Sequence, residues 1–113
     1  IRGRIMELLA SRITRDTSAA DRAFITGVLS LVDALFQAPL ESILTDFNLS
    51  EEINGALLNH DGVLGKLVSV IETLEQENYD EMETHLRDVN MTSTDLYIIE
   101  NNAIIEYESM SGM

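Results

Sequence analysis

The stretch Phe24–Phe36, FITGVLSLVDALF, is apolar on nearly every side of a helical projection and carries one carboxylate, Asp33, in its middle. This pattern predicts a helix inside a helical core, because a surface helix keeps one polar face. A buried carboxylate is costly unless it is paired or hydrogen-bonded. We therefore expect Asp33 to accept hydrogen bonds from the start of a neighbouring helix or to pair with an arginine of the first helix. A ligand-binding or signal-sensing carboxylate is the alternative.

Apolar residues recur at helical spacing on both sides of this stretch, between residues that cap helices. Pro39 suits the first position of a helix, Ser50 is a good N-cap, and Asp61 is placed to cap the helix that follows it. The expected helices cover residues 2–15, 18–37, 39–47, 51–59, 62–77, 80–89 and a final segment that begins after a cap at 92–94 and extends through 103. The sequence thus predicts an all-α protein, a compact bundle of six to seven helices in one domain over residues 1–113.

The last segment has a second reading. Residues 97–108, YIIENNAIIEYE, also fit two short strands around Asn101-Asn102, since β-branched isoleucines favour strands. An isolated hairpin has no other strand to pair with in this sequence and is marginal by itself. We expect a helix.

Composition limits the class of protein. The chain has 113 residues and no cysteine, so a disulfide framework and a thiolate metal site are both ruled out, which fits a cytoplasmic protein. No apolar run approaches the roughly 20 residues that cross a bilayer. The chain opens with Ile1 rather than Met, and we expect it to be an excised or processed piece of a longer protein.

Charge is unevenly distributed along the chain. Residues 1–22 contain five of the seven basic residues, whereas seventeen of the twenty acidic residues follow them. An acidic body of net charge -13 repels phosphate backbones, so we expect no nucleic-acid binding. The acids fit solvated helix faces. The arginines of the first helix are the candidate surface for an acidic partner or for another part of the same protein: Arg2, Arg4, Arg12 and Arg15.

His60-Asp61 is the dipeptide that supplies metal ligands in HD phosphohydrolases. Such a site needs further histidine and aspartate ligands from other helices, and His85 is the one other histidine of the chain. We expect no metal and no cofactor. Gly62-Val-Leu-Gly65 lacks the strand and the Lys-Ser/Thr ending of a phosphate-binding loop, so Gly65 is interpreted as a point of close helix packing.

Ordered spacings over most of the chain resemble the HDOD (HD-related output) domain that follows an EAL domain in bacterial signalling proteins. The matching elements are Arg22-Ala-Phe24, Gly27, Ser30-Leu-Val-Asp33-Ala-Leu35, Pro39-Leu40, Ile43-Leu44, Leu49-Ser50, Ile53, Ala56-Leu57-Leu58 and Gly62-Val-Leu-Gly65. Upstream, Arg2-Gly-Arg4 and Glu7-Leu-Leu-Ala10 are similar to the arginine-rich helix of the family. Downstream, Tyr79 and the Leu96-Tyr97 region fit its terminal helices. The family markers in this chain are Arg22, Phe24, Ser30, Asp33, Pro39, Gly62 and Gly65.

The resemblance implies the C-terminal portion of an HD-like helical domain without the metal site. The EAL domain, which in this family handles or once handled cyclic di-GMP, would precede Ile1. The acidity that follows Glu72 departs from the family pattern.

We expect a non-catalytic output module of a bacterial cyclic di-GMP-related regulator. It would act through contacts with a protein partner or with an upstream domain of the same protein. A homodimer that covers an exposed core face is a further option. The alternatives are a cryptic metal-dependent phosphohydrolase and a nucleotide-sensing domain that binds without hydrolysis, with the arginines of the first helix as its phosphate contacts.

Replacing Asp33 with Asn tests the role assigned to this carboxylate. A structural tie predicts that Asp33→Asn lowers the melting temperature and leaves partner binding unchanged, because the amide keeps the shape and loses the charge. Thermal unfolding followed by circular dichroism measures the first effect. A variant of unchanged stability that lost its partner would contradict the assignment.

Overall fold

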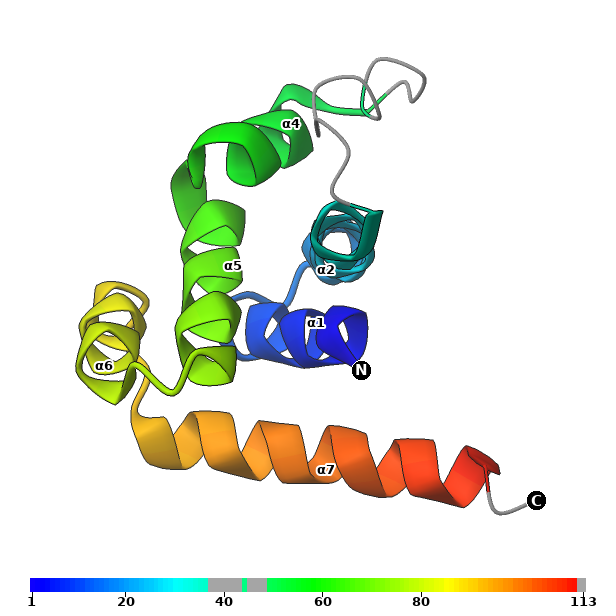
Figure 1. Ribbon diagram of the computed structural model, residues 1–113, viewed down its shortest axis with the longest axis vertical. Coiled ribbons are helices and arrows are strands. Elements are labelled where there is room, and N and C mark those ends of the chain that lie inside the picture. The colour runs from blue at the N-terminus through cyan, green and yellow to red at the C-terminus, as the bar shows by residue number, and fades with distance from the viewer. Residues whose placement is uncertain (37–43, 45–48, 112–113) are drawn as a thin grey trace.

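The computed structural model describes residues 1–36, 44 and 49–111, with the side chains of residues 33, 34, 36 and 111 left outside the description. The described helices are α1 (Arg2–Ile13), α2 (Thr17–Phe36), α4 (Glu51–Asn59), α5 (Gly62–Glu75), α6 (Tyr79–Asp88) and α7 (Ser93–Ser111) (Figure 1). The described residues contain no strand, and the prediction of an all-α bundle is confirmed. The helix expected over 39–47, with Pro39 at its start, falls outside the description except for Leu44, which is helical and buried.

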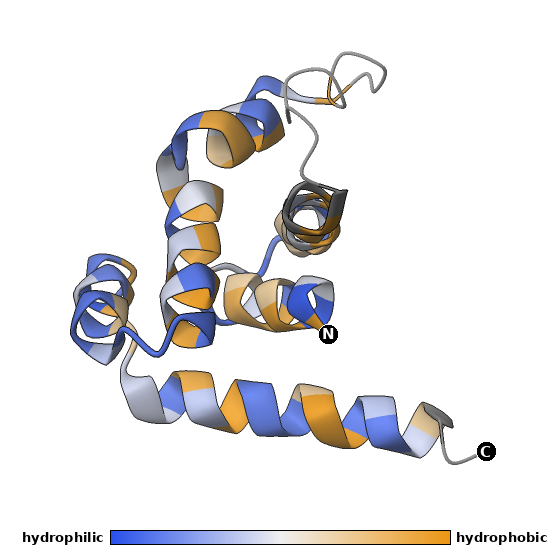
Figure 2. Cartoon of the chain, viewed as in Figure 1, coloured by the Kyte–Doolittle hydropathy of each residue, from blue (hydrophilic) through white to orange (hydrophobic). Residues whose placement is uncertain are grey.

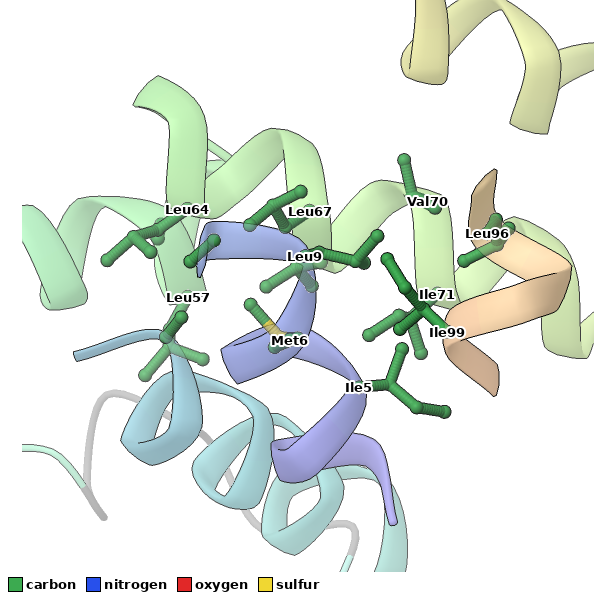
Figure 3. Packing of buried hydrophobic residues seen from close by; sticks show 14 of the residues in the cluster. Ile5, Met6, Leu9, Leu57, Leu64, Leu67, Val70, Ile71, Leu96 and Ile99 are labelled. Atoms are coloured by element: carbon green, nitrogen blue, oxygen red, sulfur yellow. The ribbon is translucent and has the colours of Figure 1, made fainter. Parts of the chain in front are cut away.

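Helix α1 lies among the other helices and packs against α2, α5 and α7. Figure 1 shows α1 between α2 and α7, beside the lower half of α5, while α4 and α6 pack against α5 elsewhere. Figure 3 shows the core that forms where these helices meet: Ile5, Met6 and Leu9 of α1, Leu57 of α4, Leu64, Leu67, Val70 and Ile71 of α5, and Leu96 and Ile99 of α7. Burial of a side chain of this size contributes about 1.5–3 kcal/mol, so this cluster is the main source of stability.

Side-chain caps begin several of the helices, as Asp16 Oδ1 does for α2 by accepting from the Ser18 N–H at 2.9 Å. The Ser50 hydroxyl accepts from the Ile53 N–H at 3.4 Å, as its sequence position predicts, and the Asn78 side chain caps α6. At the start of α7, the Asp95 N–H donates to Thr92 Oγ1 at 3.2 Å and the Thr92 N–H donates to Asp95 Oδ2 at 3.1 Å. This reciprocal capping pair favours a helix over the hairpin reading of residues 97–108, and the helix is what the structure shows.

Asp61 stands at the N-cap position of α5, but its side chain makes no capping hydrogen bond, so the capping role predicted for it is wrong. Its backbone carbonyl instead accepts from the Gly65 N–H at 3.0 Å. The helix therefore begins on a backbone hydrogen bond.

Helix α2 is less enclosed than its apolar sequence predicts. Ala23 and Thr26 are fully buried on the side that faces α1, α4 and α5. Phe24, Val28 and Leu31 lie beside the contact with α1, and they are still 42%, 42% and 38% exposed. The expectation of burial on nearly every side is wrong, because the described helices pack against one side of α2. These apolar residues of α2 are part of the molecular surface.

The backbones of α1 and α2 touch at two glycines. A Cβ atom built on Gly27 would lie 2.7 Å from the Gly3 Cα and 3.0 Å from the Arg2 carbonyl oxygen. A Cβ atom on Gly3 would lie 3.0 Å from the Phe24 carbonyl oxygen. Real Cβ atoms do not approach backbone this closely. Glycine at both positions lets the two helices cross with no side chain between them.

Because the Gly3–Gly27 crossing has no room for a methyl group, Gly27→Ala should lower the free energy of unfolding by about 1–3 kcal/mol, the usual cost of overpacking. The matched control is Gly55→Ala in α4, where the new Cβ would meet the Asp61 side chain at an ordinary 3.4 Å. That control should be neutral or stabilising, since alanine favours helix. Urea unfolding of both variants measures the difference; equal effects would show that the crossing is not tight.

None of the helices in the described part of the chain is long and apolar enough to cross a lipid bilayer.

Candidate functional site

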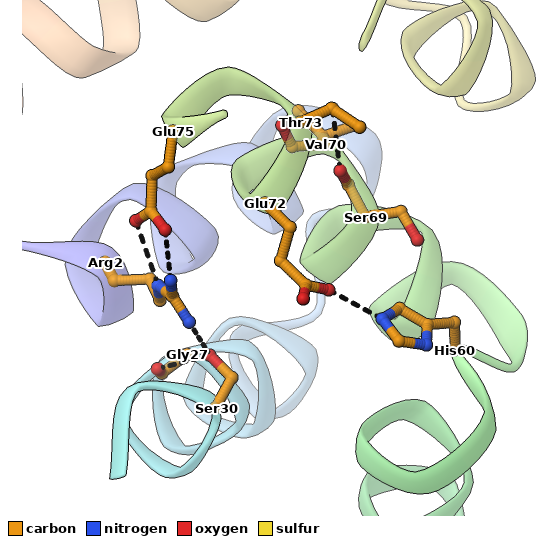
Figure 4. A network of polar contacts seen from close by, with 9 residues as sticks. All are labelled: Arg2, Gly27, Ser30, His60, Ser69, Val70, Glu72, Thr73 and Glu75. Carbon is orange, nitrogen blue, oxygen red and sulfur yellow. Dashed lines mark hydrogen bonds and ion pairs between the residues drawn. The ribbon is translucent and has the colours of Figure 1, made fainter. Parts of the chain in front are cut away.

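The arginine-rich start of α1 is the first candidate surface, and its residues contact acidic side chains of the same chain. The Arg2 guanidinium pairs with both carboxylate oxygens of Glu75 on α5, with Nε 3.1 Å from Oε2 (Figure 4). Its Nη1 donates to the Ser30 hydroxyl on α2 at 3.0 Å, and that hydroxyl donates to the Gly27 carbonyl at 2.8 Å. The Arg2 side chain is 10% exposed. One guanidinium thus connects three helices.

Two further arginines of α1 hold the long C-terminal helix. Arg4 binds Glu106 through two hydrogen bonds, Nε to Oε2 at 2.8 Å and Nη2 to Oε1 at 3.2 Å. Arg12 Nη2 lies 2.8 Å from Asp95 Oδ1. Asp95 is in the first turn of α7, whereas Glu106 is near its C-terminal end. The charges of α1 therefore fix α7 along its length, in addition to the apolar contacts of the core.

These ion pairs shift the ionisation of the groups they join. The hydrogen bond from Arg4 lowers the pKa of Glu106 below its ordinary value of 4.5. The pKa of Asp95 is lowered below 3.8 by the hydrogen bond from Arg12, with the Thr92 N–H as the next cause. The hydrogen bonds to Glu106 and then Glu7 raise the pKa of Arg4. All three shifts favour the charged forms that attach α7 to α1.

The remaining arginines of the opening segment differ from each other. Arg22 Nε lies 2.8 Å from Glu52 Oε2, and its Nη1 donates to the Ser18 hydroxyl, so Arg22 links α2 to α4. Arg15 is exposed and makes no ion pair within the described residues. The assignment of Arg2, Arg4, Arg12 and Arg15 to an interaction surface stays a prediction. In the structure, Arg2, Arg4 and Arg12 each pair with a carboxylate of the same chain.

The His60-Asp61 pair lies at the corner between α4 and α5. His60 is the C-cap residue of α4, in the left-handed region at φ 57°, and its Nε2 lies 2.6 Å from Glu72 Oε1 (Figure 4). His85 lies on α6, where its Nδ1 is 3.4 Å from the Lys66 ammonium, which also pairs with Asp88 at 2.9 Å. The two histidines thus have separate polar partners. Among the residues the structure describes, no group of three His, Cys, Asp or Glu side chains could hold a metal ion.

The two glycines of the Gly62-Val-Leu-Gly65 stretch serve the same corner. Gly62 has φ +68°, which favours glycine, and Gly65 is buried against the His60 backbone. A Cβ atom on Gly65 would overlap the His60 carbonyl group and lie 2.7 Å from its Cα. The close helix packing expected at Gly65 is confirmed.

Three family markers remain. Phe24 is partly exposed and lies beside the start of α1, near Gly3. The backbone of Asp33 is helical, but its side chain lies outside the description, as does Pro39, so the roles expected of both stay predictions.

The partners of the arginines could not be selected from the sequence. Glu75, Asp95 and Glu106 are three of seventeen acids in an acidic region, and no spacing distinguishes them. They become special only through the packing of α5 and α7 on α1. Two surface hollows beside Ile1 likewise had no signal in the sequence, since their walls come from five helices.

Comparison with known proteins gives one informative similarity. Over 95 residues, or 84% of its length, the chain is 25% identical to the cyclic di-GMP phosphodiesterase CdgJ of Vibrio cholerae. The matched segment is 22% of that protein, so the chain spans about a fifth of its relative. No family model matches the chain, and no solved structure matches it. The chain is thus distantly related to part of a protein of cyclic di-GMP signalling.

The ion pairs between α1 and α7 predict a dependence of stability on pH. A carboxylate whose pKa is lowered by folding stabilises the fold above its ordinary pKa, and this contribution disappears as the pH falls through the lowered value. Arg4→Met and Arg12→Met should therefore reduce the urea midpoint at pH 7. Their deficit relative to the unmodified chain should shrink on acidification below the ordinary values of 4.5 and 3.8.

Arg15→Met is the matched control, since it removes the same charge without breaking an ion pair in the described structure. It should change the midpoint little at any pH. Urea titrations from pH 7 down to the lowest pH at which the chain folds make the comparison. A deficit of Arg12→Met that stayed constant with pH would show that lost packing, and not the ion pair, is responsible.

Proposed function

We propose that the chain is a non-catalytic output module of the HDOD type, which acts through protein contacts in a bacterial cyclic di-GMP-related regulator. The observation that carries the proposal is the similarity to 95 residues of a cyclic di-GMP phosphodiesterase. Because these residues are a small part of that relative, its name supports the signalling context of the chain and leaves the catalytic activity to be tested separately.

The HDOD part of the proposal is supported by where the family-marker residues lie. Ser30 of α2 accepts a hydrogen bond from Arg2 of α1, and Arg22 of α2 pairs with Glu52 of α4. Gly65 lets α5 pack on the end of α4. Markers at joints between helices are expected of a pattern that specifies a fold, because such residues determine how the helices cross.

The non-catalytic part is supported by the roles of the His60-Asp61 corner. The His60 ring is hydrogen-bonded to Glu72, and the Asp61 carbonyl begins α5. Beside His85 stands the ammonium of Lys66, whose positive charge opposes a divalent cation at the same position. His60, Asp61 and His85, which are the residues considered for a metal site, thus each have a structural contact in the described part of the chain.

A hydrolysis assay tests the proposal directly. The chain is incubated with cyclic di-GMP in the presence of Mg²⁺ or Mn²⁺, and products are separated by chromatography, beside the His60→Ala variant. We expect no turnover by either protein. Metal-dependent hydrolysis by the chain that disappeared in His60→Ala would overturn the proposal in favour of a phosphohydrolase.

Titration calorimetry with cyclic di-GMP distinguishes the proposed protein-contact module from the nucleotide-sensing alternative. We expect no binding heat, because the guanidinium groups of Arg2 and Arg4 already bind carboxylates. Heat that was lost in Arg2→Ala or Arg4→Ala, with Arg15→Ala unchanged as the control, would contradict the proposal and assign a nucleotide site to α1.

A further inference from the structure

The surface around Ile1 has two hollows, which lie between residues of α2 that flank α1 and the C-terminal half of α7. The larger hollow, of about 520 Å³, has an apolar lining to which α2 contributes Leu31 and α7 contributes Ile104. The smaller, of about 250 Å³, lies between Phe24 of α2 and Met110 of α7. Ile1 lines both. We call the two hollows together the α2–α7 groove.

The groove is apolar and accessible. Ile5 and Ile71 are buried in its floor, while Leu31 and Ile104 in its walls are 38% and 37% exposed. Figure 2 shows that the apolar residues of α7 are spread around the helix, so the contact with α1 covers only some of them. Grouped apolar side chains at a concave surface are typical of a site that another chain covers.

The rim of the larger hollow is acidic. Glu75, Glu77 and Glu100 line it. Arg2, the one basic side chain among its lining residues, is already bound to Glu75. Glu77 and Glu100 make no ion pair within the described part of the chain. The groove thus combines an apolar floor with uncompensated negative charge at one edge.

We propose that the α2–α7 groove binds an amphipathic helix of a partner protein, with lysine or arginine residues beside its apolar face. This inference rests on the proposed function and specifies the surface and the kind of partner it uses. The apolar face of the helix would cover the residues Phe24, Leu31 and Ile104, and its basic residues would pair with Glu77 and Glu100.

The charge of the groove selects against a second copy of this chain. Of the seven basic side chains, six already lie in ion pairs with acidic residues of the same chain, and Arg15 is the exception within the described structure. A second copy would bring a further net charge of -13 and few cations to the acidic rim. Like charges at an interface are unfavourable, so a basic partner fits better.

A helix also fits the groove better than an extended segment. An extended segment binds well where a sheet edge offers backbone groups, and the described residues contain no strand. Over a groove lined mainly by side chains, an extended backbone would lose water without gaining hydrogen bonds. A helix satisfies its own backbone.

A designed peptide tests the groove. The probe is a fluorescein-labelled Leu/Lys peptide with leucines at helical spacing on one face, and fluorescence anisotropy measures its dissociation constant. One control peptide has the same composition in an order that gives no apolar face, and another has glutamate in place of lysine. We expect the amphipathic Leu/Lys peptide to bind more tightly than both controls.

Variants of the chain locate the site. Leu31→Asp and Ile104→Asp should each weaken binding at least about tenfold, as expected for a central apolar contact. Val63→Asp is the matched control, since Val63 is 50% exposed in the first turn of α5, outside the groove. The double variant Glu77→Gln/Glu100→Gln should weaken binding about threefold and flatten its salt dependence, because exposed ion pairs are weak. Circular dichroism checks that each variant is folded.

Three results would overturn the inference. They are equal binding of the peptide with scrambled leucines, unchanged binding by both Leu31→Asp and Ile104→Asp, and a dimer in sedimentation equilibrium that Leu31→Asp dissociates. The last result would assign the groove to a second copy. None of the three produces cyclic di-GMP hydrolysis, so failure of this inference and failure of the proposed function give different results.

Discussion

The crossing of α1 and α2 at Gly3 and Gly27 is the constraint on which the other contacts depend. Because the two backbones touch, the start of α1 lies close enough to α2 for the Arg2 guanidinium to reach Ser30 while it also binds Glu75 of α5. A guanidinium that is largely removed from water requires such partners, since an unpaired buried charge is very costly. The crossing therefore brings Arg2 to its site, and the pairing of Arg2 in turn fixes how α5 lies against both helices.

Features that depend on residues close together in the sequence could be predicted, whereas contacts between helices that are distant in the sequence could not. Helical spacing, the Ser50 cap and the tight corner at Gly65 are local features, and the structure confirms them. The enclosure of α2 depends on which faces the other helices cover, which no local pattern reports, and that prediction was wrong. The Asp61 cap failed for a related reason: the residue type and position were suitable, but the carbonyl group of Asp61 made the contact instead. The acid partners of the arginines depend on distant packing and had no local signal.

The placement of the arginines alters how the acidic composition is understood. Read along the sequence, an arginine-rich segment followed by an acidic body suggests a basic patch offered to an outside partner. In the folded chain, Arg2, Arg4 and Arg12 neutralise selected acids of α5 and α7 and thereby hold those helices. The net charge of -13 is thus left mostly on the remaining acids. Internal ion pairs of this kind give modest stability when exposed, and their larger effect here is to define which helices meet.

The same pairing determines how the surface behaves toward other molecules. Because the net charge is -13, the field outside the molecule is negative, and like-charged partners meet a barrier that rises as salt is lowered. Six of the seven basic side chains are paired within the chain, so few cations are left to attract an acidic partner locally. Electrostatic repulsion opposes contact between the exposed apolar residues of α2 and other acidic chains, including copies of this chain. An exposed apolar surface in a strongly negative field favours partners that are both apolar and basic. Selectivity of this kind needs no catalytic group and is consistent with a module that transmits a signal by contact.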